Sequence, residues 1–289
     1  MFRGTITAII TPFKKDGSID EDALRHLVTF QEENGTDAVV PCGSTGESAT
    51  LSFDEHLRVV SIVVDQVKRA KVIAGAGSNS TAEAISLSRR AEDAGADGIL
   101  SISPYYNKPT QEGIFRHYES ISGAINVPLI VYNVPGRTAS NITSDTMLRL
   151  AGLSGIGGVK EASGDLGQIQ RILDGRPKGF SVLSGDDPLT YEMMRMGCDG
   201  TISVASNCVP RRISEMVSLC LSGNMNDALK IHTELSPLFI ALFCETNPIP
   251  IKYIMARMGY GSGMLRLPLT ELTEKNRASV DAVLKSIGL

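Results

Sequence analysis

The side chain with the clearest chemical potential is Lys160, a lysine near the end of the short apolar run from Ile156 to Ser163. Apolar runs of this length are typical of buried strands. An amine buried in a strand loses solvation, which lowers its pKa toward neutrality. A neutral amine can attack a carbonyl carbon and form a Schiff base. Lys160 is therefore a candidate nucleophile, although the run alone allows equally well a lysine that ends its strand and extends its amine to water.

Other polar side chains also follow short apolar runs, in the segments Gly43–Glu47, Ser103–Pro109, Tyr132–Thr138, Ser184–Asp187 and Gly200–Ser203. A positioned phenol such as Tyr132 can transfer protons. A guanidinium such as Arg137 can bind a carboxylate with two hydrogen bonds, and the N–H groups of Gly43–Glu47 can bind an anion. We expect Asp186 and Asp187 to cap the following helix. Taken singly, each segment also fits an ordinary role as a turn, a strand aromatic or a solvated charge.

An alternation of strand and helix patterns positions these residues. The expected strands are Thr5–Thr11, Ala38–Gly43, Val72–Gly77, Gly98–Ser103, Leu129–Val134, Ile156–Glu161, Phe180–Gly185 and Gly200–Ala205. Ser52 and Ser80 each precede a glutamate by three residues, which is the pattern of a capping box. Eight strand–helix repeats predict an α/β fold of the (β/α)8 barrel type, whose active site lies at the carboxyl ends of the strands. Lys160 would then share one rim with the other polar groups, which favours its role as a nucleophile.

The competing architecture is an open, doubly wound sheet. That fold usually has a glycine-rich phosphate loop after its first strand, and Thr11-Pro12-Phe13 does not supply one. No strand pattern follows residue 221, whereas residues 225–244, 248–258 and 270–287 have helical patterns. We therefore expect a barrel over residues 1–224 and a C-terminal helical region over residues 225–289 that packs on it.

The composition is that of a soluble protein and argues against nucleic acid and membranes as partners. Hydrophobic residues make up 42% of the chain, charged residues 21%, and the net charge is −4, as in an ordinary soluble domain without a basic surface for nucleic acid. No apolar run approaches the roughly 20 residues of a membrane span, and the N-terminus lacks a signal-peptide pattern. Five cysteines without a CxxC pair indicate free thiols and a cytoplasmic location. The scattered histidines predict no metal site.

Five segments together resemble the dihydrodipicolinate synthase family, in the superfamily that includes N-acetylneuraminate lyase. They are Gly43–Thr50 (GSTGESAT), Ser103–Pro109 (SPYYNKP), Tyr132–Thr138 (YNVPGRT), Val159–Ala162 (VKEA) and Asn247–Lys252 (NPIPIK). The resemblance runs from Ala8 to Pro268 and so covers nearly the whole chain. It implies a lyase that condenses pyruvate with L-aspartate 4-semialdehyde on the route to diaminopimelate and lysine. The lysine imine would be the only cofactor.

The resemblance also implies roles for individual residues in the reaction. Lys160 would form the Schiff base, and Tyr132 would donate and accept protons. Ser44 and Tyr106 would complete a hydroxyl relay with Tyr132. In the family the tyrosine that matches Tyr106 comes from the neighbouring subunit, which implies a dimer at minimum and usually a homotetramer built from two tight dimers.

For substrate binding, the resemblance implies that Thr45 and the backbone at Ile202 hold pyruvate, and that Arg137 binds the carboxylate of the semialdehyde. Ser44 departs from the family pattern, which commonly has threonine there, and the serine form also appears in the lyase branch. N-acetylneuraminate lyase or another pyruvate-dependent sugar-acid aldolase is therefore the alternative, although Arg137 suits a small carboxylated aldehyde better than a sugar. A non-catalytic ligand-binding barrel is a remote alternative, because it needs neither Lys160 nor Tyr132.

Some family members bind L-lysine as an inhibitor at the dimer interface. The matching positions are Ser48, Ala49, Phe53, His56, Asn79, Glu83 and Tyr105. Glu83 could pair with the ligand's ammonium group, and His56 and Asn79 could add polar contacts. Phe53 replaces a histidine found in one version of this site. Feedback by L-lysine is thus a hypothesis that the sequence raises.

Overall fold

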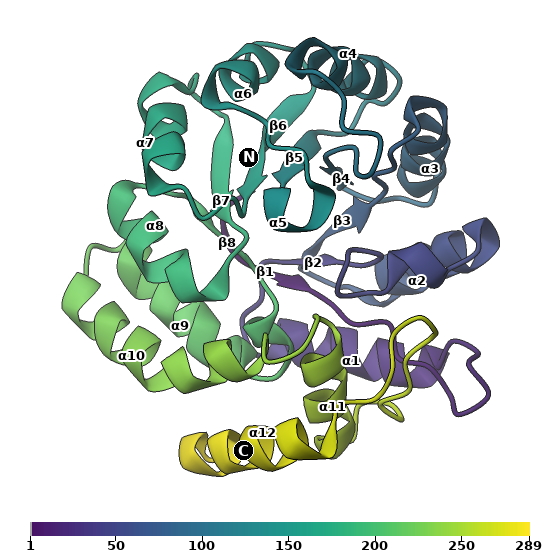
Figure 1. The fold of residues 1–289 in the computed structure, drawn as a ribbon, viewed down its shortest axis with the longest axis vertical. Helices are drawn as coiled ribbons and strands as arrows, with labels where there is room; N and C mark the ends of the chain where they lie inside the picture. The colour runs from purple at the N-terminus through teal and green to yellow at the C-terminus, as the bar shows by residue number, and fades with distance from the viewer. Residues whose placement is uncertain (1) are drawn as a thin grey trace.

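The computed structural model describes residues 2–289 and has a closed barrel of parallel strands at its centre, with helices around it (Figure 1). The strands are β1 (Gly4–Ala8), β2 (Ala38–Val40), β3 (Lys71–Gly75), β4 (Gly98–Ile102), β5 (Leu129–Asn133), β6 (Ile156–Glu161), β7 (Ser181–Ser184) and β8 (Gly200–Ser203). Each strand pairs with the next, and β8 pairs with β1 through partners such as Ile6 and Ile202, which closes the barrel. The predicted (β/α)8 fold is confirmed.

The predicted strands were too long at their carboxyl ends. β6 has the predicted bounds, whereas each of the others ends one to three residues earlier than predicted. The apolar pattern continues beyond the last ladder hydrogen bond because the chain stays buried as it leaves the sheet. The residues that follow the strands therefore form loops on the face where an active site is expected.

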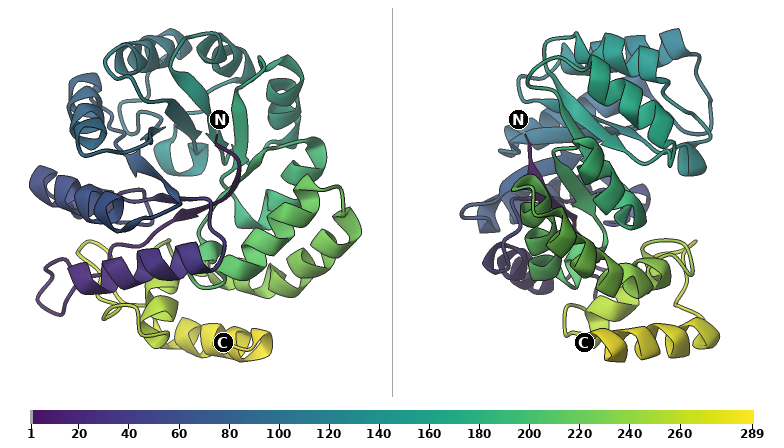
Figure 2. Two further views of the ribbon diagram at one scale, coloured as in Figure 1. Left: turned by 180° about the vertical axis from the view of Figure 1, so that it is seen from behind. Right: turned by 90° about the vertical axis from the view of Figure 1, so that its left-hand side faces the viewer.

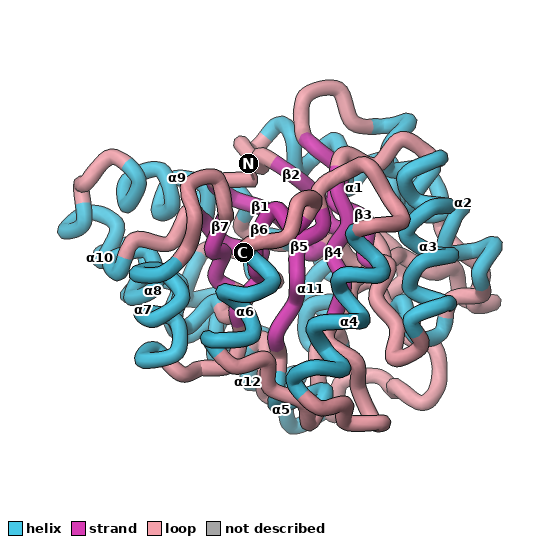
Figure 3. Tube along the Cα trace, turned by 90° about the horizontal axis from the view of Figure 1, so that it is seen from above, coloured by secondary structure: helices cyan, strands magenta, loops and turns pink. Residues whose placement is uncertain are grey.

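Helices surround the barrel on all sides, as the views from behind and from above show (Figures 2 and 3). They are α1 (Glu21–Glu33), η1 (Ser48–Thr50), α2 (Phe53–Gln66), α3 (Thr81–Asp93), α4 (Gln111–Ser122), α5 (Pro135–Thr138), α6 (Ser144–Ala151), α7 (Leu166–Gly175), η2 (Asp187–Leu189), α8 (Thr190–Met196), η3 (Ala205–Asn207), α9 (Pro210–Leu221), α10 (Met225–Ala241), α11 (Ile249–Arg257) and α12 (Glu274–Ile287). Ser52 and Glu55 form the predicted capping box at α2. At α3, Ser80 caps the helix, but the Glu83 carboxylate accepts from the Ser78 hydroxyl instead, so the second predicted box is incomplete.

Both faces of the strands are buried, as is usual in parallel sheets. The barrel interior is filled by one set of apolar side chains, which includes Ile6, Val40, Ile73, Leu100, Ile130, Leu183 and Ile202. Alternate strand residues such as Val39, Val131 and Val159 face the helices and belong to a second, larger core. Polar groups at the carboxyl end of the interior therefore lie directly on a layer of apolar side chains.

The chain after β8 is helical, as predicted. α10 packs against α9 and α12, and α11 contacts η3, so the C-terminal helices lie along one side of the barrel (Figure 1). α10 and α12 are shorter than the predicted helices, because α10 ends at Ala241 and α12 begins at Glu274. The division into two regions at residue 224 stays a prediction. Within residues 2–289, none of the helices combines the length and the apolar character needed to cross a membrane.

Candidate active site

Lys160 and Tyr132 lie side by side at the carboxyl end of the barrel interior. They are register partners on β6 and β5, and the Lys160 Nζ atom lies 4.3 Å from the centre of the Tyr132 ring. Their side chains are almost fully enclosed, with 5% and 7% of each residue exposed. Burial lowers the pKa of Lys160 to about 8, although the Asp187 carboxylate opposes this shift. Burial raises the pKa of Tyr132 to about 12. The pair thus combines an amine that is readily deprotonated with a phenol that keeps its proton.

Gly185, directly after β7, leaves room for the lysine side chain. A Cβ atom at this position would lie 2.9 Å from Lys160 Cε and 2.9 Å from Ala162 Cβ. These distances are well inside the 3.5–4.0 Å of normal carbon contacts. A side chain at residue 185 would therefore press on the lysine and displace it. The apolar pattern predicts that Gly185 lies at a strand end, but nothing in the sequence connects it with Lys160.

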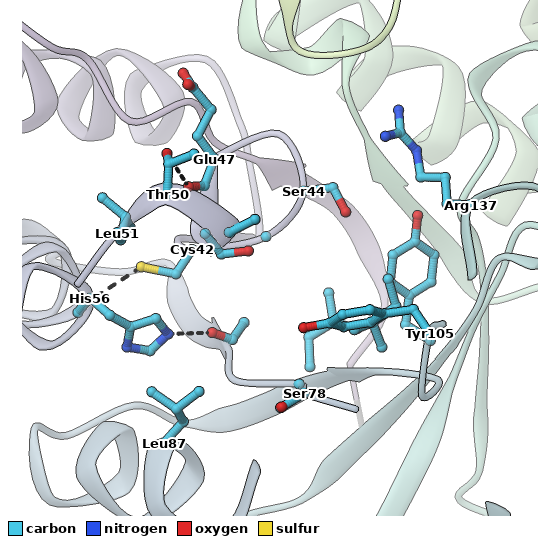
Figure 4. Close-up of a pocket in the computed structure, with 18 of the residues that line it drawn as sticks. Cys42, Ser44, Glu47, Thr50, Leu51, His56, Ser78, Leu87, Tyr105 and Arg137 are labelled. Carbon is cyan, nitrogen blue, oxygen red and sulfur yellow. Dashed lines mark hydrogen bonds between the residues drawn. The ribbon is translucent and has the colours of Figure 1, made fainter. Parts of the chain in front are cut away.

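A small cavity surrounds the Lys160 amine. Its polar lining includes Ser44, Thr45, Tyr132, Arg137, Lys160 and Asn247. Ser44, Tyr132, Arg137 and Asn247 also line a larger adjoining cavity of about 670 Å³. Figure 4 shows the larger cavity, with the Ser44 hydroxyl directed toward the side on which Arg137 lies. Five residues that the sequence predicted for the site, on three different segments, are therefore brought together.

Asn247 connects two of these residues and was not assigned a role from the sequence. Its Nδ2 atom donates to the Thr45 hydroxyl at 3.0 Å, and its backbone carbonyl accepts from the Arg137 guanidinium at 3.2 Å. Its Oδ1 atom is buried and has no hydrogen-bond partner among the described residues. Asn247 belongs to the quoted segment NPIPIK, which lies about 110 residues from Arg137 in the chain. Only the folded chain places it beside the site.

The prediction for Asp186 and Asp187 was wrong in its detail. Asp186 precedes η2 but makes no side-chain cap. The Asp187 carboxylate instead accepts from the backbone N–H groups of Val204 at 3.0 Å and Ala205 at 2.9 Å, which follow β8. Asp187 therefore reaches across to the neighbouring strand end, because parallel strands bring their carboxyl ends to the same rim. Burial raises the pKa of Asp187 and leaves the group close enough to influence Lys160.

Two predicted residues do not line the cavity around Lys160. Tyr106 is 89% exposed and has a left-handed backbone with φ of 71°, so its side chain is not part of its own chain's site. Ile202 lies in β8 with its side chain in the apolar interior of the barrel. Its backbone, next to Ser203, is the part predicted to hold pyruvate.

The residues predicted to bind L-lysine are near one another. Ser48, Ala49, Phe53, His56, Glu83 and Tyr105 line the larger cavity, and Asn79 donates to the Tyr105 carbonyl at its edge at 3.1 Å. His56 contacts the Gly75 carbonyl through Nε2 at 2.6 Å (Figure 4), and burial lowers its pKa. A neutral His56 that donates from Nε2 is therefore oriented by the backbone of β3.

Comparison with known proteins agrees with the geometry. The family model described as "Dihydrodipicolinate synthetase family" matches residues 1–287. The 4-hydroxy-tetrahydrodipicolinate synthase of Chloroherpeton thalassium is 51% identical over 99% of this chain and 95% of that protein. The protein of the same name from Pelobacter propionicus is 49% identical over 100% of both chains.

Solved structures agree over the same length. The dihydrodipicolinate synthase of Aquifex aeolicus superposes with a TM-score of 0.98 at 45% identity, over 100% of this chain and 99% of that one. The chloride-inhibited enzyme of Acinetobacter baumannii, complexed with pyruvate, gives 0.98 at 42% identity, with 100% and 99% covered. The enzyme of Cyanidioschyzon merolae with lysine bound gives 0.97 at 40% identity, again over 100% and 99%. With its closed barrel and its buried lysine, this chain belongs to the dihydrodipicolinate synthetase family.

Proposed function

We propose that the chain condenses pyruvate with L-aspartate 4-semialdehyde through an imine on Lys160, and that it acts in diaminopimelate and lysine biosynthesis. The observation that carries this proposal is the buried Lys160 amine, whose pKa is lowered to about 8, with its Nζ 4.3 Å from the ring centre of Tyr132. Full-length relatives at about half identity carry the corresponding enzyme name. The pyruvate complex of the Acinetobacter baumannii relative supports pyruvate as the first substrate.

In the first half of the reaction, the neutral Nζ of Lys160 attacks the keto carbon of pyruvate. The resulting carbinolamine loses its hydroxyl as water, with a proton from the Tyr132 phenol, and leaves a protonated imine. Thr45 and the backbone at Ile202 hold the pyruvate carboxylate. The positive imine nitrogen then draws electrons from the methyl carbon, so that this carbon can lose a proton. No further cofactor or metal takes part in these steps.

In the second half, loss of the methyl proton gives an enamine whose carbon attacks the aldehyde of the semialdehyde. Arg137 binds the carboxylate of this substrate with its planar pair of donors. The new alkoxide takes a proton, and the substrate's amino group then adds to the imine carbon and expels Lys160, which closes the ring and frees the enzyme. Protons move along Ser44, Tyr132 and Tyr106 of the partner subunit.

The assembly that this relay needs is a homo-oligomer, and we propose a homotetramer of two tight dimers. Tyr106 supports it, because a tyrosine that is 89% exposed in a single chain is available to a neighbouring subunit. We also propose that L-lysine binds in the larger cavity, on the strength of the lysine-bound relative from Cyanidioschyzon merolae. The buried free thiols Cys42, Cys198, Cys208 and Cys220 support a location in the reducing cytoplasm.

Ser44 supports a second candidate function, a pyruvate-dependent sugar-acid aldolase such as N-acetylneuraminate lyase, because the lyase branch also has serine at this position. One experiment separates the possibilities. The enzyme is incubated with pyruvate, reduced with borohydride and analysed by peptide mass, and turnover is then measured with aspartate semialdehyde and with sugar aldehydes. An adduct on Lys160 together with turnover of the semialdehyde is the expected result. An adduct with turnover of sugars alone would favour the aldolase, and the absence of any adduct would favour a binding protein.

A further inference from the structure

We infer that Glu47 and Lys252 are positioning residues for pyruvate binding. Their buried ion pair joins the turn after β2 to helix α11 and so holds the hydroxyls of Ser44 and Thr45 in place. The inference rests on the proposed function, because that function assigns the Thr45 hydroxyl to pyruvate binding and the Ser44 hydroxyl to proton transfer beside it. It assigns to the C-terminal region a part in the active site.

The turn that carries these hydroxyls has an unfavourable backbone. Cys42 and Glu47, at its two ends, both have left-handed conformations, with φ of 56° and 53°. Residues with a Cβ atom adopt this conformation at a cost in free energy, and it persists only where the surroundings enforce it. Within the turn, a Cβ atom at Gly46 would lie 3.1 Å from the Cys42 nitrogen. The turn therefore depends on contacts with the rest of the chain.

The Glu47 side chain makes such contacts on the side away from the substrate cavity. In Figure 4 its carboxylate points away from the cavity, whereas the Ser44 hydroxyl points into it. The carboxylate accepts from the Lys252 ammonium group through one oxygen and from the Arg266 backbone N–H at 3.1 Å through the other. The side chains of Glu47 and Lys252 are each only 1% exposed. Both oxygens of Glu47 are thus used by the C-terminal region.

The positive charges of Lys252 and Arg266, the two cations beside Glu47, are each paired with a carboxylate. The Lys252 Nζ atom lies 4.1 Å from the centre of the buried Phe13 ring, and the guanidinium carbon of Arg266 lies 4.3 Å from the same ring. Arg266 pairs in turn with Glu55 at 2.5 Å. Two carboxylates therefore neutralise two cations, with an aromatic face that favours both cations. Removal of one charge alone would leave an uncompensated charge in a buried place.

The segment that leads into α11 also contacts the turn after β2 at a second point. Asn247, two residues before α11, donates to the Thr45 hydroxyl at 3.0 Å. Inside the turn, the Glu47 N–H donates to the Ser44 carbonyl at 3.2 Å. A displacement of Glu47 would therefore move Ser44 through the backbone. These contacts connect the Glu47–Lys252 pair to the hydroxyls of Ser44 and Thr45, which a purely stabilising ion pair would not require.

The test uses the double variant Glu47→Gln/Lys252→Met, which removes the pair without leaving a buried charge. The pyruvate concentration for half-maximal borohydride trapping and the KM values for both substrates are measured in the full-length enzyme. Without the pair, the hydroxyls of Ser44 and Thr45 are no longer held in the position that pyruvate requires. We therefore expect the pyruvate KM to rise roughly tenfold or more. The KM for the semialdehyde should rise less than the pyruvate KM, because Arg137 is held by the backbone carbonyl of Asn247, a group that neither substitution changes.

A matched control is Glu32→Gln, at the opposite end of the barrel. Glu32 is also a buried carboxylate, 8% exposed, and accepts from the backbone N–H groups of Lys68, Arg69 and Ala70 before β3. We expect this variant to lose thermal stability while its pyruvate KM is unchanged. If the double variant does not fold, Glu47→Asp is measured instead, because it keeps the charge balance while it shortens the side chain by one methylene group, and a smaller rise in pyruvate KM is expected.

Two outcomes would overturn the inference. The folded double variant, or Glu47→Asp where the double variant fails to fold, could bind pyruvate as the unmodified enzyme does. Alternatively, Glu32→Gln could raise the pyruvate KM as much as the pair variants do, which would reveal a general effect of lost stability. Failure of the proposed function is a different result, since the unmodified enzyme would then give no pyruvate adduct at all.

Discussion

Tyr132 and Lys160 are direct register partners on adjacent strands of the barrel, and the lysine amine lies 4.3 Å from the centre of the tyrosine ring. Burial shifts the two groups in opposite directions on the pH scale, because their charged forms have opposite signs. The pKa of Lys160 falls to about 8, and that of Tyr132 rises to about 12. Between these two values the neutral amine coexists with the protonated phenol, which is the combination that carbinolamine dehydration requires.

The lowered pKa of Lys160 predicts how adduct formation depends on pH. Below a pKa of about 8 the amine is mostly protonated and cannot attack, so the trapping rate should rise with pH and level off above this value. We expect an increase of roughly fivefold from pH 7 to pH 8 and less than twofold from pH 9 to pH 10. Single-turnover trapping with saturating pyruvate measures this profile. A rate that still climbs about tenfold per unit up to pH 10 would indicate a solvated lysine of ordinary pKa.

Substitution Tyr132→Phe should slow the reaction strongly while leaving the fold intact. The phenol lies against the lysine, and Tyr132 is the one phenol among the described residues that line the cavity around Lys160. General acid–base groups contribute about 10² to 10⁴ in rate, so kcat should fall by about this range. Steady-state kinetics and circular dichroism check the two parts. A folded variant with near-normal kcat would remove Tyr132 from the mechanism.

Substitution Arg137→Lys should impair binding of the semialdehyde more than binding of pyruvate. Lysine keeps the positive charge but loses the planar pair of donors, so the semialdehyde KM should rise roughly tenfold or more. Adduct formation with pyruvate should change less, because Arg137→Lys keeps the positive charge that helps to lower the pKa of Lys160. KM values for both substrates give the answer. Equal losses for pyruvate and for the semialdehyde would contradict the assignment.

Calorimetric titration tests the binding of L-lysine. We expect heat at millimolar ligand, and we expect Glu83→Gln to weaken binding by about tenfold, because an ammonium group in a partly enclosed cavity loses its counter-charge. Glu119→Gln provides a control, since Glu119 pairs with Arg116 on the exposed face of α4. Titrations of the unmodified enzyme that give no heat at millimolar L-lysine would refute the site.

The sequence predicted the barrel and the Lys160 site because both depend on local patterns. Apolar runs of strand length repeat with helical patterns between them, and the rule that parallel strands bring their carboxyl ends to one rim then collects Ser44, Tyr132, Arg137 and Lys160. The exact ends of the strands could not be predicted, because buried loop residues continue the apolar pattern. Cys42, with its left-handed backbone, is an example.

The contacts that the sequence did not predict connect distant segments. Asn247 and Thr45 are 202 residues apart, and Lys252 and Glu47 are 205 residues apart. No periodicity links such positions, and a lysine in a helical pattern, or an asparagine just before one, normally faces solvent. The prediction for Asp187 failed for a related reason. A carboxylate before a helix normally caps that helix, but here the carboxylate accepts from two N–H groups that follow the neighbouring strand.

The absence of a side chain at Gly185 has a consequence for transplanting this chemistry into another barrel. A lysine placed at the end of a sixth strand would still be blocked if the residue after the seventh strand carried even a methyl group, because that group would meet the lysine at 2.9 Å. The lysine belongs to the sixth strand and the glycine follows the seventh, so introducing the lysine is of no use without the glycine. Both residues would therefore have to be introduced together for the lysine to take the position that it has here.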